Sequence, residues 1–301
     1  MIIDAHSHLW LKQDTYVNGK RILSLKDGRS IFMDNEVQMM PPFMIDGTNK
    51  AEVFLSNMNY AQVGGAVVVQ EIIDGNQNDY LSEVQRQYPD RFFCMGMAMT
   101  EEQAVQAKAM GLKGIAIPGH RVDEPLQSLM PMFKYMESEG LVLSMCLKAE
   151  DKQIGEMREV IEECPDMKVA IGHFGFADQP KGTDEEKRIW RDTVKLCSIN
   201  DNVRIESGGI TWIFNTEFYP FPTAVGCIRE AIDMVGADRV MWGSDYPRTI
   251  TAITYRMSYD FVCKSPLLSD TEKALFLGEN AKQFYGFGNL PELPYIKNMS
   301  E

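Results

Sequence analysis

Residues 1–8 read MIIDAHSH, a short apolar run that ends in two closely spaced histidines, His6 and His8. Seven further apolar runs follow, and longer segments with a helical pattern of polar and apolar residues lie between them. Near-continuous apolar strands that alternate with helices are typical of a parallel sheet. The eight runs are residues 1–8, 64–71, 91–99, 112–120, 141–148, 167–175, 202–209 and 238–245.

Eight strand–helix units predict a closed (β/α)8 barrel, the TIM barrel of the α/β class, which typically needs about 250 residues. A doubly wound open sheet is the main alternative, but no G-x-G-x-x-G motif follows the first run. We therefore expect residues 1–301 to form one barrel domain.

Residues 11–50 interrupt this rhythm directly after the first strand. Asp27-Gly28 lies between two short strand-like runs, which predicts a β-hairpin. An insertion in the first βα loop would lie over the end of the barrel where active sites are found. A lid over the site and a packed surface insertion are both compatible with this position. Four apolar side chains could cover a flat or aromatic substrate, or serve in simple packing: Phe32, Met39, Met40 and Phe43.

The composition narrows the class of partner. The apolar fraction of 45% is sufficient for a sizeable core, and 43 acidic against 30 basic residues give a net charge of −13. Nucleic acids and anionic membranes attract basic surfaces, so neither is expected as a partner. An anionic small-molecule substrate needs only local positive charge and stays open, as does assembly into a homo-oligomer.

Cysteine usage and hydropathy indicate a cytoplasmic protein. The six cysteines are scattered without a C-x-x-C motif, which fits reduced thiols better than a disulfide framework. The histidine pair precedes any apolar segment of a signal peptide. No apolar run approaches the roughly 18 residues of a membrane span.

All four histidines of the chain stand at the ends of predicted strands. Residues two apart in a strand face the same way, so His6 and His8 should both point into the barrel. A single histidine at such a place is usually structural, but these ends converge at one mouth of a barrel, which indicates an active site. Paired imidazoles suit a divalent metal or a polarised substrate oxygen. The converging set is His6, His8, His120, His173 and Asp245.

Charged side chains near the same ends could bind a substrate carboxylate. Arg121, Lys148 and Arg248 are candidates beside His120, and Glu71 follows the second strand. Each of them is also compatible with an ordinary solvated surface charge. Arg248 is the best placed, because it follows Asp245 by three residues.

Four segments resemble the amidohydrolase superfamily in its amidohydrolase 2 branch: IIDAHSH, VAIGHFG, RVMWGSDYP and LSDTEKALFLGENAKQFYGF. That branch contains lactonases and decarboxylases related to aminocarboxymuconate semialdehyde decarboxylase. The resemblance spans nearly the whole chain in the right order. It does not explain the insertion at residues 11–50 or the last dozen residues.

The fifth predicted strand, LVLSMCLK, departs from the decarboxylases. In metal-dependent members this strand ends in a metal-binding histidine, which is absent here. Cys146 lies nearest that position and is either a small buried residue or a substitute ligand. Residues 140–175 and the run GGAVVVQE resemble the lactonases more closely, a group that includes sugar-lactone and pyrone-dicarboxylate lactonases. The fifth strand of that group typically ends in a basic residue, matched here by Lys148.

The resemblance implies a hydrolase that opens a lactone or similar cyclic ester of a carboxylate-bearing or sugar-acid substrate. Asp245 would activate the water, and His173 would be the second catalytic residue. His6, His8 and Asp245 would hold a divalent ion, with Zn²⁺ expected and His173 as a further candidate ligand, or the histidines would contact the carbonyl directly. Two alternatives stay open: a metal-dependent non-oxidative decarboxylase of an aromatic or unsaturated carboxylic acid, and a barrel that only binds.

Overall fold

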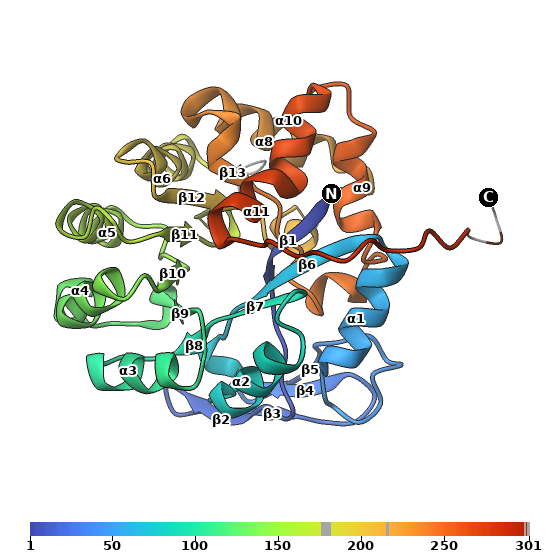
Figure 1. Ribbon diagram of the computed structural model, residues 1–301, viewed down its shortest axis with the longest axis horizontal. Helices are drawn as coiled ribbons and strands as arrows, with labels where there is room; N and C mark the ends of the chain where they lie inside the picture. The colour runs from blue at the N-terminus through green and yellow to red at the C-terminus, as the bar shows by residue number, and fades with distance from the viewer. Residues whose placement is uncertain (176–181, 215–216, 298, 300–301) are drawn as a thin grey trace.

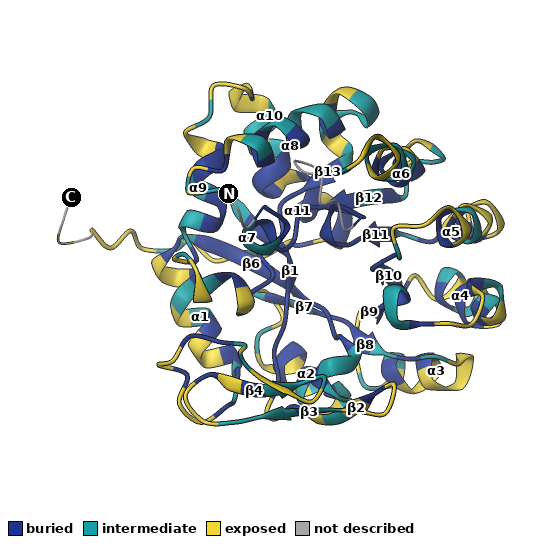
Figure 2. Cartoon of the chain, turned by 180° about the vertical axis from the view of Figure 1, so that it is seen from behind, coloured by how far each residue is buried: buried dark blue, intermediate teal, exposed yellow. Residues whose placement is uncertain are grey.

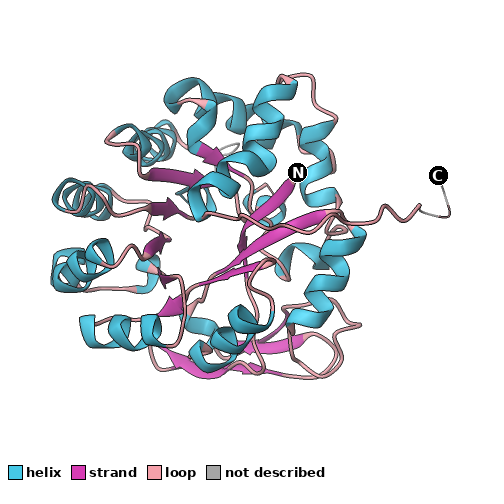
Figure 3. Cartoon of the chain, viewed as in Figure 1, coloured by secondary structure: helices cyan, strands magenta, loops and turns pink. Residues whose placement is uncertain are grey.

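The eight predicted runs form parallel strands around a common axis (Figures 1 and 3). The computed structural model describes all residues except 176–181, 215–216, 298 and 300–301. The strands of the barrel are β1 (Ile2–Ser7), β6 (Val63–Val68), β7 (Phe92–Cys94), β8 (Gly96–Met97), β9 (Gly114–Ile117), β10 (Val142–Met145), β11 (Val169–Ile171), β12 (Val203–Glu206) and β13 (Val240–Met241).

Backbone hydrogen bonds join these strands into a closed ring. The third run forms two short strands, of which β7 pairs with β6 and β8 pairs with β9. The last strand meets the first through Ala5 N, which donates to Trp242 O at 2.9 Å, and Asp245 N, which donates to His6 O at 2.9 Å. The predicted (β/α)8 barrel is confirmed.

Helices surround the barrel, with their buried sides toward the strands and their exposed sides outward (Figure 2). The amphipathic segments at residues 79–88, 129–140, 152–165 and 223–237 fall in helices α2, α4, α5 and α8, because their apolar positions recur at helical spacing. No helix in the described part of the chain has the length and apolar character needed to cross a bilayer. The helices are α1 (Ala51–Tyr60), α2 (Asn78–Gln87), α3 (Glu101–Ala109), α4 (Met130–Ser138), α5 (Asp151–Glu163), α6 (Asp184–Lys195), α7 (Ile210–Ile213), α8 (Pro222–Val235), α9 (Met257–Cys263), α10 (Asp270–Ala274) and α11 (Asn280–Tyr285).

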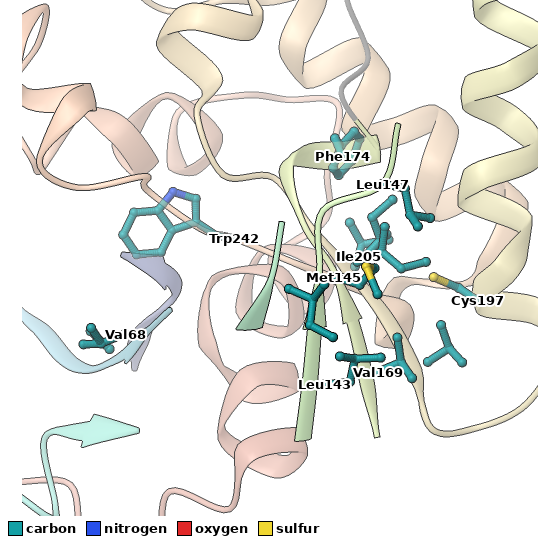
Figure 4. Close-up of a cluster of buried hydrophobic side chains, with 14 of the residues drawn as sticks. Val68, Leu143, Met145, Leu147, Val169, Phe174, Cys197, Ile205 and Trp242 are labelled. Atoms are coloured by element: carbon teal, nitrogen blue, oxygen red, sulfur yellow. The ribbon is translucent and has the colours of Figure 1, made fainter. Parts of the chain in front are cut away.

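The strands separate two apolar regions. One lies between the strands and the helices, where Leu143, Met145 and Val169 pack in the cluster shown in Figure 4. The other fills the barrel beneath its mouth and includes Val67 and Ala116, with side chains of α11 packed against it. Because apolar side chains fill this lower part, only the upper part of the barrel is left for chemistry.

The insertion forms a separate antiparallel sheet in the order β2-β3-β4-β5. The predicted hairpin is confirmed: Asp27 and Gly28 take φ values of 59° and 69° between the paired strands β3 and β4. Two further hairpins, at Asn18-Gly19 and Met33-Asp34, were not predicted, although Asn-Gly is itself a hairpin signal. The strands are β2 (Asp14–Val17), β3 (Lys20–Ser24), β4 (Arg29–Phe32) and β5 (Asn35–Gln38).

Candidate active site

Four predicted site residues lie together at the mouth of the barrel. The Nε2 atoms of His6 and His8 are 3.2 Å apart, and His8 Nε2 is 3.2 Å from Asp245 Oδ1. The ring centre of His173 is 4.3 Å from that of His6. The structure therefore brings together side chains from the end of β1, from the residue after it, and from the segments that follow β11 and β13.

An irregularity in β1 orients the histidine pair. The pairing of β1 with β6 shifts register between Asp4 and Ser7, where an extra residue changes the simple alternation of faces. Asp4 fixes this segment, because its Oδ1 accepts from His6 N at 3.1 Å and from Ser244 N at 2.8 Å. Burial raises the pKa of Asp4 to about 6, although hydrogen bonds from Ser244 and Tyr255 oppose this shift.

Glu206, at the end of β12, supports the site from within the barrel. It is 1% exposed, its Oε1 lies 2.8 Å from His6 Nδ1, and it accepts from His173 N at 2.9 Å. Burial raises the pKa of Glu206, but the charge of His6 and its hydrogen bond outweigh this and hold the pKa below its usual value. Space for this contact requires Gly243, where a Cβ would lie 2.4 Å from Glu206 Oε2 and 2.7 Å from His6 Cβ.

The other two inner histidines are oriented in the same way. His8 Nδ1 lies 3.1 Å from the Val69 carbonyl and 3.5 Å from Asp74 Oδ2. His173 Nδ1 lies 3.2 Å from the Gly208 carbonyl. An acceptor beside each Nδ1 favours a proton there and turns the Nε2 atom of each inner histidine toward the centre of the site.

This donor set fits a divalent cation. One ligand atom each from His6, His173 and Asp245 lie within 4.8 Å of one another. His8 lies outside that group, but its Nε2 is within 3.2 Å of both His6 Nε2 and Asp245 Oδ1. Imidazole nitrogens turned toward each other beside a carboxylate need a shared proton or cation, and nitrogen with oxygen ligands suits Zn²⁺.

The backbone is left-handed at two of these residues, with φ of 53° at His173 and 58° at Asp245. Such a conformation costs of order 1–3 kcal/mol for a non-glycine residue and is concentrated at functional sites. Trp212 helps to hold the aspartate, because its Nε1 donates to Asp245 Oδ2 at 2.6 Å. Trp212 was not predicted, since it lies outside the strand runs.

The ionisable side chains of the site have pKa values that are shifted in different directions. Burial raises the pKa of Asp245, but the hydrogen bond from His8 and the charge of His173 outweigh it, so that pKa lies below its usual value. Burial lowers the pKa of His8, but Asp245 and Asp74 outweigh it and hold that pKa well above its usual range. Burial, followed by the charge of His6, lowers the pKa of His173 to about 4. An anionic base therefore stands beside a neutral imidazole at neutral pH.

A cavity of about 270 Å³ opens above these groups. The insertion supplies part of its wall and thus covers the mouth of the barrel. Met40 and Phe43 do not line it: the buried Met40 packs with Trp10 and Met44, and Phe43 is 67% exposed. The lining from the insertion consists of Gln13, Phe32 and Met39, and Trp10, which directly precedes the insertion, lines the cavity as well.

Three of the four predicted substrate-binding residues line this cavity: His120, Arg121 and Arg248. The Nε of Arg121 lies 3.0 Å from both carboxylate oxygens of Glu71, so its charge is already balanced. Arg248 is exposed and stacks over the Trp212 ring at 5.2 Å.

Lys148 does not line the cavity, because its Nζ lies 3.1 Å from Asp123 Oδ1. Its role in substrate binding stays a prediction. Burial and the nearby charge of Arg121 lower the pKa of His120 to about 3, so this side chain is a neutral polar group.

The family model described as Amidohydrolase (Amidohydro_2) matches residues 3–287. The chain belongs to this amidohydrolase family. The predicted resemblance is thereby confirmed, and the family consists of enzymes. No curated protein matches the chain.

Several solved structures are similar to this amidohydrolase. A probable 2-pyrone-4,6-dicarboxylic acid hydrolase from Acinetobacter baumannii, with citric acid bound, has 19% identity and a TM-score of 0.70 over 95% of this chain and 99% of its own. A zinc-bound amidohydrolase from Burkholderia multivorans has 14% identity and a TM-score of 0.68 over 97% and 100%. A manganese-bound 5-carboxyvanillate decarboxylase from Novosphingobium aromaticivorans has 17% identity and a TM-score of 0.54 over 78% and 80%. At these identities the similarity shows a shared fold.

Cys146 occupies the strand-five position of this amidohydrolase. Its side chain is buried beside His6, His8 and His173, and burial raises the pKa of its thiol well above the usual value. Binding of a metal to this thiol would first have to remove its proton, which costs free energy. Within the described residues, the cluster of ligand atoms does not include Cys146, which favours its interpretation as a small packing residue.

Proposed function

We propose that this amidohydrolase opens a lactone or similar cyclic ester of a carboxylate-bearing or sugar-acid substrate. The observation that carries this proposal is the buried Asp245 carboxylate, held below its usual pKa and placed 3.2 Å from His8 at the mouth of the barrel. The strand-five position, where decarboxylases of this branch have a histidine, holds the thiol of Cys146 instead. A buried carboxylate beside polarising groups suits the activation of water.

In this mechanism Asp245 takes a proton from water while the water oxygen attacks the lactone carbonyl. The bond between the carbonyl carbon and the ring oxygen then breaks, and the proton passes to that oxygen, so one water and one lactone give one hydroxy acid. The Trp212 hydrogen bond to Oδ2 holds the carboxylate in place, which leaves Oδ1 facing the histidines. His173, neutral at pH 7, is the second group able to accept or return a proton.

A divalent ion, with Zn²⁺ expected, would be held by His6, His8 and Asp245. His173 is a fourth candidate ligand, because its ligand atom lies within 4.8 Å of those of His6 and Asp245. When bound, such an ion polarises the carbonyl and lowers the pKa of water. Glu206 and Asp74 support this function, because acceptors on Nδ1 strengthen Nε2 as a ligand.

The cavity supports a substrate with one apolar face and one anionic group. Trp10, Phe32 and Met39 supply apolar walls. Arg248 makes no ion pair with any described residue, so it is the cation free to bind a substrate carboxylate. The six unpaired cysteines support a reducing, cytoplasmic location.

The cluster of possible metal ligands also supports a second candidate function, the metal-dependent decarboxylation of an aromatic or unsaturated carboxylic acid. A panel of lactones and aromatic acids separates the two reactions. Lactone opening releases acid, which a pH indicator follows, whereas decarboxylation releases carbon dioxide. Acid release without carbon dioxide is expected, and carbon dioxide release from an aromatic acid would overturn the proposal.

A further inference from the structure

One residue of the insertion is connected to the catalytic histidines through side chains. Gln13 is 0% exposed, and its Nε2 donates to Asp74 Oδ1 at 2.9 Å. Its backbone carbonyl accepts from Ser24 N at 2.8 Å, and the Ser24 and Ser30 hydroxyls each lie 3.4 Å from its Oε1. Gln13 is thus fixed by strands β3 and β4 and directs its amide toward the barrel.

Asp74 is the next member of this chain of contacts. It is 2% exposed, and its Oδ2 lies 3.5 Å from His8 Nδ1, an atom that also faces the Val69 carbonyl at 3.1 Å. The same oxygen accepts from Glu71 N at 3.2 Å, so the carboxylate is held by one backbone donor and by Gln13. Loss of the Gln13 amide would leave Oδ1 buried without its donor, and the carboxylate would have to rotate or take up a proton.

We propose that Gln13 and Asp74 are positioning residues that set the orientation of His8 together with the Val69 carbonyl, so that the packing of the insertion on the barrel completes the site. The inference rests on the place of His8 in the proposed function. Neither residue needs to touch the reacting atoms, because each acts through His8. The insertion is then part of the catalytic machinery as well as the wall of the cavity.

Gln77 provides a matched control in the same region. Its Oε1 accepts from Leu11 N at 3.2 Å, and its Nε2 donates to Lys12 O at 2.9 Å, so it also anchors the insertion. Its contact with Asp74 is to the backbone carbonyl, at 2.7 Å, and does not involve the carboxylate. Loss of Gln77 should loosen the same segment without releasing the Asp74 side chain.

The test measures zinc affinity by competition with a chromophoric chelator. The full-length parent protein is compared with four variants: Gln13→Met, Asp74→Asn, Gln77→Met and the double variant Gln13→Met/Asp74→Asn. Loss of an outer partner of a ligating histidine typically weakens metal binding about 10–100-fold. We expect a loss of this size for Gln13→Met and Asp74→Asn, no further loss in the double variant, and near-parental affinity for Gln77→Met. Equal losses for Gln13→Met and Gln77→Met, or additive losses in the double variant, would refute the inference.

Crystal structures of the parent, Gln13→Met and Gln77→Met proteins decide the question independently of zinc and substrate. His8 and Asp74 should change orientation in Gln13→Met and keep it in Gln77→Met. An unchanged His8 ring in Gln13→Met would overturn the inference even if the protein opens lactones. A shifted ring in a protein that opens no lactone would instead leave the positioning role intact and reject the proposed function.

Discussion

Replacing His173 with asparagine should make the metal-free protein less sensitive to acid. Asparagine tolerates the left-handed backbone at this position, and its amide can still donate to the Gly208 carbonyl. It does not titrate. In the parent protein, burial and the charge of His6 lower the pKa of His173 from 6.5 to about 4, so the folded state resists a proton that the unfolded state accepts.

The sign and size of this effect follow from proton linkage. The stability that neutral His173 allows is fully present above pH 6.5 and is lost progressively as the pH falls toward about 4. Between pH 6.5 and pH 5, about 1.5 pH units at about 1.36 kcal/mol each give a loss of about 2 kcal/mol. Titration of other groups is common to both proteins and cancels in the comparison.

Urea unfolding at pH 7 and pH 5, with a chelator present, measures this difference. The parent protein should lose about 2 kcal/mol more than His173→Asn between the two values. Equal losses in the two proteins would show that His173 is not held neutral in the folded state. A larger loss in the variant would reverse the sign and refute the argument from burial.

Three further substitutions and one control variant test the assignment of roles. Asp245→Asn should keep the fold and lower kcat about 10²–10⁴-fold, because it cannot take a proton from water; activity close to that of the parent would identify another group as the base. Cys146→Ser should retain zinc and activity, because the buried Cys146 thiol has a raised pKa and lies outside the ligand cluster. Loss of zinc from this variant in elemental analysis would identify Cys146 as a ligand. Arg248→Met should raise KM for an anionic substrate by about 10–100-fold, as expected for loss of a charged hydrogen bond of about 1.5–3 kcal/mol. Lys148→Met should raise KM much less, because Lys148 pairs with Asp123. Equal increases of KM in the two variants, measured by steady-state kinetics, would reject this distinction.

The order of apolar runs was enough to predict the barrel. Each run is short and almost continuously apolar, as expected of a buried strand. Segments with the 3.6-residue period of an amphipathic helix lie between the runs. The same regularity placed the histidines and Asp245 at strand ends, which in a barrel meet at one mouth. The Asp27-Gly28 hairpin was equally predictable, because its turn chemistry is local.

Pairwise contacts between distant segments depended on the tertiary structure. Glu206 stands inside an apolar run, and nothing local in the sequence shows that its carboxylate reaches His6 across the barrel. Trp212 lies in the short helix α7 and Gln13 in the insertion, and no periodicity of the sequence determines the path of either segment. Lys148 lies at the predicted strand end but is paired with Asp123 rather than facing the cavity.

The sequence by itself therefore determined which elements form and which ends of the strands carry the chemistry. Those features follow from the period of apolar residues and from local turn preferences. Only the tertiary structure decided which Nδ1 meets which acceptor, which arginine is already neutralised, and how the insertion reaches His8. Such contacts depend on the closure of the barrel and on side-chain orientation, which bring together residues as far apart in sequence as Asp4 and Ser244.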